Sequence, residues 1–211
     1  MTLAIMCALL FLASIVFSFL GQGGGALYTP IQIFLGVDFH TAAATSLFLI
    51  MTVSLSSTLV FRKAGRIDWP LAIMLEIVTA LGGFTGGLSS GLFSATSLSV
   101  VLACFIGIAA IFMITNYEKN TTVHDDGPRL HVWHRRWNGY HYGVNLGLAL
   151  PVSFLAGLIS GMVGIGGGIL KVPMMVLLLG IPMEIAIGSS AFMVGVTAAS
   201  GCVGHVTLDH W

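Results

Sequence analysis

Two glycine clusters are the residues of this sequence best suited to chemistry inside an apolar environment. Residues 21–25 (GQGGG) and 164–168 (GIGGG) each follow a long apolar stretch and precede a short one. Glycine favours helix poorly, so each cluster predicts a break from which a new helix starts. The first turn of a helix offers unpaired N–H groups and partial positive charge, which attract anions. The residues interpreted as an anion cradle are Gly23, Gly24, Gly25, Gly166, Gly167 and Gly168. The alternative is that these glycines only allow helices to pack closely.

Two hydroxyl pairs follow the clusters, Thr45-Ser46 and Ser189-Ser190. Each pair lies one turn or more into the next apolar span, where its hydroxyls can complete the coordination of an anion. The alternative is a hydroxyl that bonds to the carbonyl four residues back in its own helix.

Two charged residues lie within apolar segments. Lys171 is the only basic residue deep in such a segment, and Glu76 lies about six residues into another. Charges inside a membrane are costly and usually functional, so we interpret Lys171 as a residue that attracts the anion and Glu76 as a candidate for proton coupling. Snorkelling of Lys171 and an interfacial position for Glu76 are the alternatives.

Other chemical patterns are weak. Residues 87–91 fit the nucleophile pattern G-x-S-x-G, and residues 21–26 loosely fit a dinucleotide fingerprint, but no strand is expected before either. His131 and His134 have metal-ligand spacing without a cysteine or carboxylate set to join them. The three cysteines lie in apolar stretches, and the net charge is zero. The sequence therefore predicts no enzyme activity, metal, cofactor or nucleic-acid partner.

The composition places these residues in a membrane. Hydrophobic residues make up 56% of the 211-residue chain and charged residues only 8%, against about 25% charged in a soluble domain. The long apolar stretches predict an all-α, polytopic transmembrane bundle, because a membrane β-barrel would show alternating segments of about ten residues.

The expected spans have unequal lengths. They are 3–20, 39–61, 71–91, 97–114, 144–163 and 184–203, with short segments at 26–35 and 169–179. A short segment of ten residues reaches about 15 Å as a helix, half of a bilayer. We expect a first repeat at 1–115, a polar loop at 116–142 and a second repeat at 143–211.

Basic residues orient the chain. The loops at 62–69 and 116–142 hold seven of the eight Lys and Arg residues, and two spans separate them. Positively charged loops stay in the cytoplasm, so we expect both loops there, in a multi-pass protein of the cell (inner) membrane. Tryptophans and tyrosines among the arginines of the second loop are typical of an interfacial amphipathic stretch.

An internal repeat connects the two clusters. Residues 21–30 (GQGGGALYTP) align with 164–173 (GIGGGILKVP), and Gly36, Ala42 and Phe48 then align with Gly180, Ala186 and Phe192. The second copy lacks the last two spans of the first, which suggests a fragment or a shortened relative. The copies are inverted if each short segment counts as a crossing, and parallel if it is re-entrant.

The doubled triple-glycine element, its downstream proline and the Thr/Ser pair resemble the TauE/SafE family of sulfite and sulfonate exporters. The resemblance covers almost the whole chain and implies a multi-pass permease for small sulfur-containing anions. We therefore expect a small anionic substrate, a lipid environment and, as the favoured transport mode, sulfite or organosulfonate export. Uptake of another anion and a non-transporting membrane scaffold are the alternatives.

Overall fold

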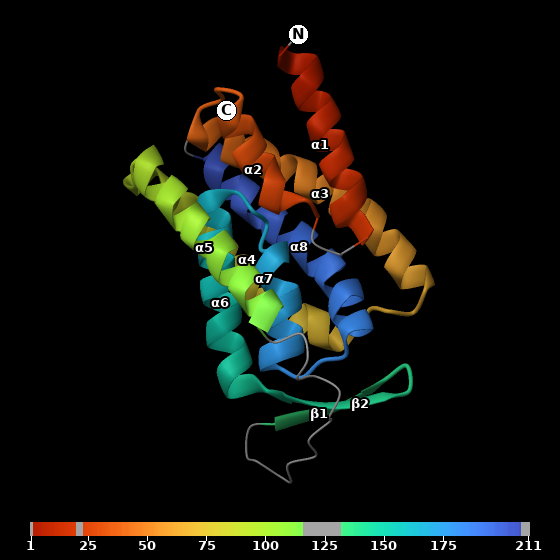
Figure 1. Cartoon of the computed structure of the whole chain (residues 1–211). Coiled ribbons are helices and arrows are strands. Elements are labelled where there is room, and N and C mark those ends of the chain that lie inside the picture. The colour runs from red at the N-terminus through yellow and green to blue at the C-terminus, as the bar shows by residue number, and fades with distance from the viewer. Residues whose placement is uncertain (1, 20–22, 116–131, 208–211) are drawn as a thin grey trace.

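A computed structural model describes residues 2–19, 23–115 and 132–207 of the chain. It is a bundle of helices with one two-stranded hairpin at its end, which confirms the helical fold class (Figure 1). The helices are α1 (Thr2–Phe19), α2 (Gly25–Phe34), α3 (Phe39–Lys63), α4 (Trp69–Ser89), α5 (Ala95–Thr115), α6 (Leu146–Val163), α7 (Gly168–Pro173) and α8 (Met183–Val206). The strands are β1 (Val132–Trp137) and β2 (Tyr140–Asn145). A 3-10 turn (Ser90–Leu92) follows α4, and a π-helical turn (Met174–Leu178) follows α7.

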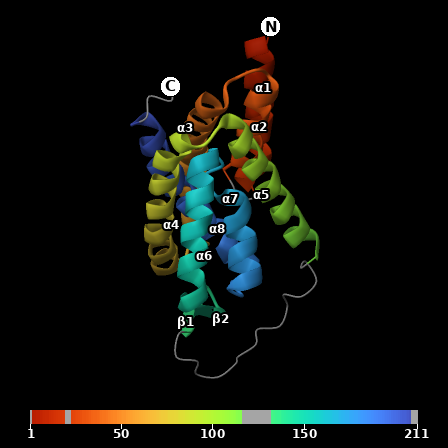
Figure 2. The same ribbon diagram turned by 90° about the vertical axis from the view of Figure 1, so that its left-hand side faces the viewer.

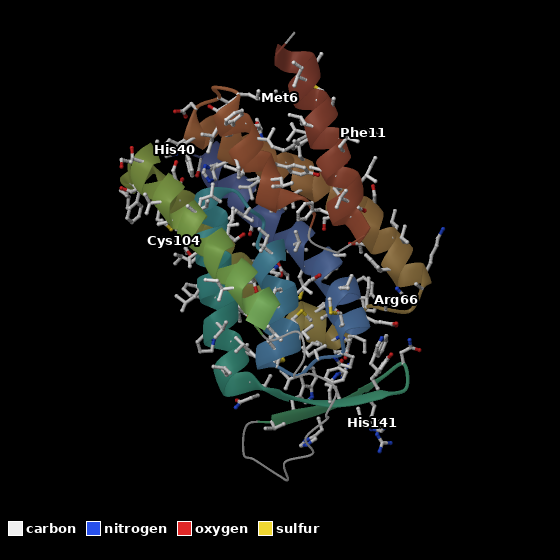
Figure 3. The ribbon with its side chains drawn as sticks, viewed as in Figure 1. Met6, Phe11, His40, Arg66, Cys104 and His141 are labelled. Atoms are coloured by element: carbon white, nitrogen blue, oxygen red, sulfur yellow. The ribbon has the colours of Figure 1, made fainter. Side chains whose placement is uncertain are left out.

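Four of the described helices are long and apolar enough to cross a membrane. They are α3, α4 with its 3-10 turn, α6 and α8. Shorter apolar helices lie within α1 (Ala4–Ser18) and α5 (Ala95–Cys104). The outer surface of the bundle is apolar as well: Phe11 on α1 is 65% exposed and points away from the bundle (Figure 3). A surface of this kind is suited to lipid.

The half-length helices occur where the sequence predicts them. Helix α2 has ten residues, and α7 with its π-helical turn spans 168–178. Pro173 carries no N–H donor, and the backbone after it takes the wider π-helical turn. The prediction of short helices after the glycine clusters is therefore confirmed, with boundaries one residue away from those expected.

The two aligned segments of the chain run in opposite directions (Figure 1). The Ser54 hydroxyl near the middle of α3 donates to the Ala191 carbonyl of α8, and Arg66, just beyond the end of α3, lies 3.9 Å from Glu184 at the start of α8. Helices α3 and α8 are therefore antiparallel. Opposite directions are what the inverted form of the predicted repeat requires.

Helix α4 lies against both α6 and α8 (Figure 2). Glycines allow this close approach: a Cβ at Gly86 would collide with the Leu158 carbonyl of α6, and one at Gly161 would collide with the Gly83 carbonyl of α4. Backbone-to-backbone contact of this kind replaces the hydrophobic driving force that is missing between helices in lipid. It holds Glu76, on α4, close to α7 and α8.

The hairpin corrects one expectation. The sequence predicts a polar loop with an interfacial stretch for residues 132–142, and they instead form β1, the turn and the first half of β2. Asn138 (φ 49°) and Gly139 (φ 82°) make the turn with the left-handed backbone that favours a two-residue hairpin. The second segment is expected to begin at residue 143, but β2 continues to Asn145. Residues 116–131 of the expected loop lie outside the described residues.

The hairpin and the loop after α3 lie at the same end of the bundle, where the Trp137 indole N–H donates to the Gly65 carbonyl at 3.2 Å. We expect single cysteines at Ala64 and Gly139 to react with an impermeant maleimide from one membrane face, and a cysteine at Phe93 from the other. Labelling of intact cells and of inside-out vesicles, with the native cysteines replaced, measures this. Labelling of positions 64 and 139 from different faces would contradict the arrangement.

Candidate functional site

Both glycine breaks converge on the same place between α3 and α8. The described glycines with left-handed backbone in the two breaks are Gly23, Gly24, Gly164, Gly166 and Gly167, with φ values of 68°, 82°, 81°, 70° and 75°. A Cβ at Gly23 would lie 3.0 Å from Ile50 Cγ2 and 3.0 Å from Val194 Cγ1. A Cβ at Gly166 would lie 2.9 Å and 3.5 Å from the same two atoms. The predicted breaks are therefore confirmed for the described residues; Gly21 and Gln22 lie outside them.

The two breaks also touch each other. A Cβ at Gly25 would collide with the backbone carbonyl of Ile165, and the Thr29 hydroxyl donates to the Gly164 carbonyl at 3.2 Å. The backbone of one break thus fills the space beside Gly25. At this position the close-packing alternative accounts for the glycine.

The start of α7 is lined by polar groups. Gly168 begins the helix, and a Cβ at Gly167 would lie 3.3 Å from Ser160 Oγ and 3.4 Å from Lys171 Cε. The Ser160 hydroxyl is buried and has no hydrogen-bond partner among the residues that the structure describes. At the first break, a Cβ on Gly24 would collide with the ring of Tyr28, the residue that aligns with Lys171. The two breaks therefore differ chemically.

Lys171 lies at the centre of a buried polar cluster. Its Nζ is 2.7 Å from Glu76 Oε2 and 2.6 Å from Thr197 Oγ1. The Thr197 hydroxyl donates in turn to Glu76 Oε1 at 2.5 Å. Three helices contribute to this cluster: α7, α4 and α8. We call these three residues the lysine cluster.

The lysine cluster is closed to solvent. Lys171 and Thr197 are 0% exposed and Glu76 is 3% exposed. The snorkelling alternative for Lys171 is therefore wrong, and so is the interfacial alternative for Glu76. One positive and one negative side chain leave the cluster without net charge. Burying such a pair gives little or no stability compared with apolar side chains of the same volume, whereas removing one partner is strongly destabilising.

The Thr45 and Ser46 hydroxyls near the start of α3 both have hydrogen-bond partners. Thr45 Oγ1 lies 2.8 Å from the Thr41 carbonyl and 2.5 Å from Gln32 Oε1. The Gln32 amide of α2 donates to Ser46 Oγ at 2.8 Å. The backbone-bonded alternative is present at Thr45, and Gln32 connects both hydroxyls to α2.

The hydroxyls on α8 lie near the hairpin end. The backbone N–H of Asp68 donates to Ser189 Oγ at 3.1 Å. Ser190 donates to the Ile187 carbonyl at 2.9 Å. Since Ser189 precedes Thr197 by eight residues, it lies about 12 Å along α8 from the lysine cluster.

A second buried charged cluster joins the hairpin to the bundle. The carboxylate of Asp68 is 0% exposed and accepts hydrogen bonds from the Arg135 guanidinium and the Tyr142 hydroxyl. Burial raises the pKa of Tyr142, and its hydrogen bond to Asp68 raises it further. The phenol therefore remains a hydrogen-bond donor at neutral pH.

Sequence reasoning missed several of these residues. Thr197 and Ser160 are single hydroxyl residues inside apolar spans, and only their convergence with Lys171 distinguishes them. Gln32 is a polar residue inside a short apolar segment, a signal that the sequence does contain. Arg135 and Tyr142 alternate with exposed residues on either side of Asn138-Gly139, which is the pattern of a hairpin.

The patterns set aside in the sequence have structural positions too. Residues 87–91 form the end of α4 and its 3-10 turn, where Ser89 bonds to the Gly86 carbonyl of its own helix. His134 is on the outer face of the hairpin, and His131 is outside the described residues. Within the described ranges, no group of three or more His, Cys, Asp or Glu residues could hold a metal ion.

Comparison with known proteins agrees with this membrane architecture. The family model described as sulfite exporter TauE/SafE matches residues 6–211. A probable membrane transporter protein of Bacillus subtilis, YunE, is 28% identical over 228 aligned positions, which cover 100% of this chain and 80% of the relative. A probable membrane transporter protein of Methanocaldococcus jannaschii is 25% identical, with coverage of 94% and 70%. Sulfite exporter TauE/SafE family protein 5 of Arabidopsis thaliana is 31% identical over 49% of this chain and 24% of its own length. No solved structure matches the chain.

Proposed function

The chain belongs to the sulfite exporter TauE/SafE family of membrane transporters, and on that premise we propose that it exports a small anion, sulfite or an organosulfonate. The permease acts in the cell (inner) membrane, with the hairpin end of the bundle in the cytoplasm. A helical bundle with membrane-capable helices and a buried lysine supports this proposal.

The observation that carries this proposal is the lysine cluster beside an unsatisfied hydroxyl. Lys171 is fully buried, and the Ser160 hydroxyl, unpartnered among the described residues, lies beside Gly167 at the start of the same helix. A buried ion pair gives little stability, so its presence in an apolar bundle favours a functional role. An oxyanion beside Lys171 would receive a charged donor from the amine and a neutral donor from Ser160.

In this mechanism the anion takes the place that the Glu76 carboxylate occupies on Lys171. Anion, carboxylate and lysine together would leave one uncompensated negative charge in the bundle. Protonation of Glu76 removes that charge. The neutral carboxyl no longer needs Lys171 and keeps its hydrogen bond with Thr197. Glu76 therefore couples the anion to a proton.

The glycine breaks complete the site. We assign the backbone N–H groups at Gly166, Gly167 and Gly168 to the anion, and those at Gly23 and Gly24 to the opposing wall. The antiparallel directions of α3 and α8 support inverted repeats, whose relative movement would expose the site to one face and then the other. The hydroxyls of Thr45, Ser46, Ser189 and Ser190 lie towards the two ends of this path.

Gly167→Ala tests the cradle against a matched control. The new methyl group would lie within 3.4 Å of Ser160 and Lys171, so we expect transport to fall about tenfold or more. Gly180→Ala is the control. Gly180 has a similar positive φ (65°, against 75° for Gly167), and a Cβ added there would have no atom within 4 Å. Both variants carry similar backbone strain, about 1–2 kcal/mol. We therefore expect Gly180→Ala to transport like the wild type.

The measurement is the initial rate of labelled sulfite uptake by proteoliposomes that contain equal amounts of inserted protein. Sulfoacetate and sulfate serve as competitors and identify the preferred anion, and reversing the gradient gives the direction. Equal loss of transport in both glycine variants would leave only backbone strain as the cause and would contradict the cradle.

A further inference from the structure

The hairpin covers one end of the bundle with one of its two faces. Cross-strand register pairs Trp133 with Val144 and Arg135 with Tyr142, so these four side chains share a face. Tyr142 and Val144 are buried in the apolar core that the hairpin forms with α4, α8 and the end of α7. The other face carries Arg136 and His141, which are exposed; His141 points away from the bundle (Figure 3).

Asp68 connects the hairpin to the helices. Its carboxylate accepts from Arg135 and Tyr142 of the hairpin and caps the start of α4 by accepting from the Leu71 N–H at 3.5 Å. Its own N–H donates to Ser189 of α8. The carboxylate of Asp68 therefore joins the hairpin to α4, and the backbone N–H of the same residue joins both to α8.

The covered core lies between this end of the protein and the lysine cluster. Glu76 follows Asp68 by eight residues, about 12 Å along α4. Leu71, Leu75 and Met175 are 0% exposed and belong to the same core as Tyr142 and Val144. Lys171 is itself 0% exposed, so among the described residues the buried core separates it from the hairpin end.

We propose that the β1–β2 hairpin is the gate on this side of the permease and that the Asp68–Arg135–Tyr142 cluster is its latch. The proposal rests on the proposed transport function, because a gate needs a path to close. A buried ion pair suits a contact that must open, since both charged groups regain hydration when they separate and the closed state gains little net free energy. The apolar core beneath the hairpin can exclude water while the hairpin is in place, and the ion pair allows the hairpin to separate from the bundle.

A buried cysteine beneath the hairpin tests the gate without any transport assay. Met175→Cys is introduced after Cys7 and Cys104 are replaced by serine, and the buried Cys202 of α8 is kept as an internal reference. The full chain in lipid nanodiscs is treated with a water-soluble maleimide, and mass spectrometry gives the labelling rate at each cysteine. Nanodiscs expose both faces, so the result is independent of orientation.

Arg135→Gln, added to this Met175→Cys background, is the test variant, and Arg136→Gln is its matched control on the opposite face of the same strand. We expect Arg135→Gln to raise the labelling rate of the introduced cysteine about tenfold or more, because it leaves the buried Asp68 carboxylate without its cation. Arg136→Gln should leave that rate unchanged, and Cys202 should label at its wild-type rate in both. An unchanged rate at the introduced cysteine in Arg135→Gln, or an equal rise at Cys202, would overturn the latch.

Fixing the hairpin in place provides the second test. Ala64→Cys and Trp137→Cys, next to the Trp137–Gly65 hydrogen bond, are joined by a short reducible cross-linker in proteoliposomes. We expect the cross-link to stop sulfite transport and reduction to restore it, whereas the cross-linker should not change the transport rate of either single-cysteine variant. Full transport by the cross-linked protein would overturn the gate. If the wild type itself transports none of the tested anions, the proposed function fails, while the labelling result still decides whether the hairpin opens.

Discussion

Replacing Lys171 together with Glu76 by apolar side chains of similar size should abolish transport and leave the protein folded. In Lys171→Met/Glu76→Leu the bundle loses both buried charges at once, and such replacements are often neutral or stabilising. The anion, however, loses the charged donor that holds it. Charged hydrogen bonds contribute roughly 1.5–3 kcal/mol each. If the anion loses two hydrogen bonds from the Lys171 ammonium group, transport falls about a hundredfold or more. Uptake of labelled sulfite by proteoliposomes, normalised to inserted protein, measures the effect.

The single variant Lys171→Met separates charge from packing. It leaves the Glu76 carboxylate buried without its cation, a change that costs about 3–5 kcal/mol. We expect this variant to give less folded protein than the double variant, as judged by size-exclusion chromatography and thermal unfolding. A double variant that transports like the wild type would remove Lys171 from the site. Equal stability of the single and double variants would show that the ion pair is not buried as described.

Gly25→Ala should prevent correct folding, whereas Gly107→Ala should be harmless. A methyl group at Gly25 collides with the backbone carbonyl of Ile165 in the opposing break, and backbone cannot move away as a flexible side chain can. Gly107 is also helical but has no atom within 4 Å of its added Cβ. Alanine favours helix over glycine by about 1 kcal/mol, so any loss at Gly25 comes from the collision.

The yield of monodisperse protein and its thermal unfolding temperature measure this prediction. We expect Gly25→Ala to be recovered at a several-fold lower yield, and Gly107→Ala to match or exceed the wild type. Normal folding of Gly25→Ala would mean that the two breaks do not touch, and the shared site between α3 and α8 would then be wrong.

The sequence is sufficient to predict the breaks, the half-length helices and the two unusual charges. Glycine clusters and apolar segments of ten residues are local signals, and α2 and α7 follow them closely. Lys171 and Glu76 are each conspicuous alone, because a charge in an apolar segment needs no partner to be noticed. Their pairing joins residues 95 positions apart, and it depends on how closely α4 and α7 approach.

Other features are absent from local patterns or hidden within them. Thr197 resembles any other hydroxyl residue in a membrane helix until Lys171 and Glu76 surround it. The sequence pattern assigns Thr45 and Ser46 to the anion, but Gln32, from a short apolar segment, engages both of them. The hairpin has a sequence signal in Asn138-Gly139, which the high density of aromatic and basic residues around it obscures.

Proton-coupled movement of an anion that does not itself titrate is the most direct test of the whole account. Labelled methanesulfonate, the anion of a strong acid, and labelled sulfite are supplied to proteoliposomes that contain the wild-type chain and a trapped pH dye. We expect saturable uptake of one or both anions, inward proton movement with methanesulfonate wherever it is taken up, and neither signal in Lys171→Met/Glu76→Leu. Uptake of both anions at the rate of protein-free liposomes, or equal uptake by the double variant, would contradict a permease that binds its anion at Lys171.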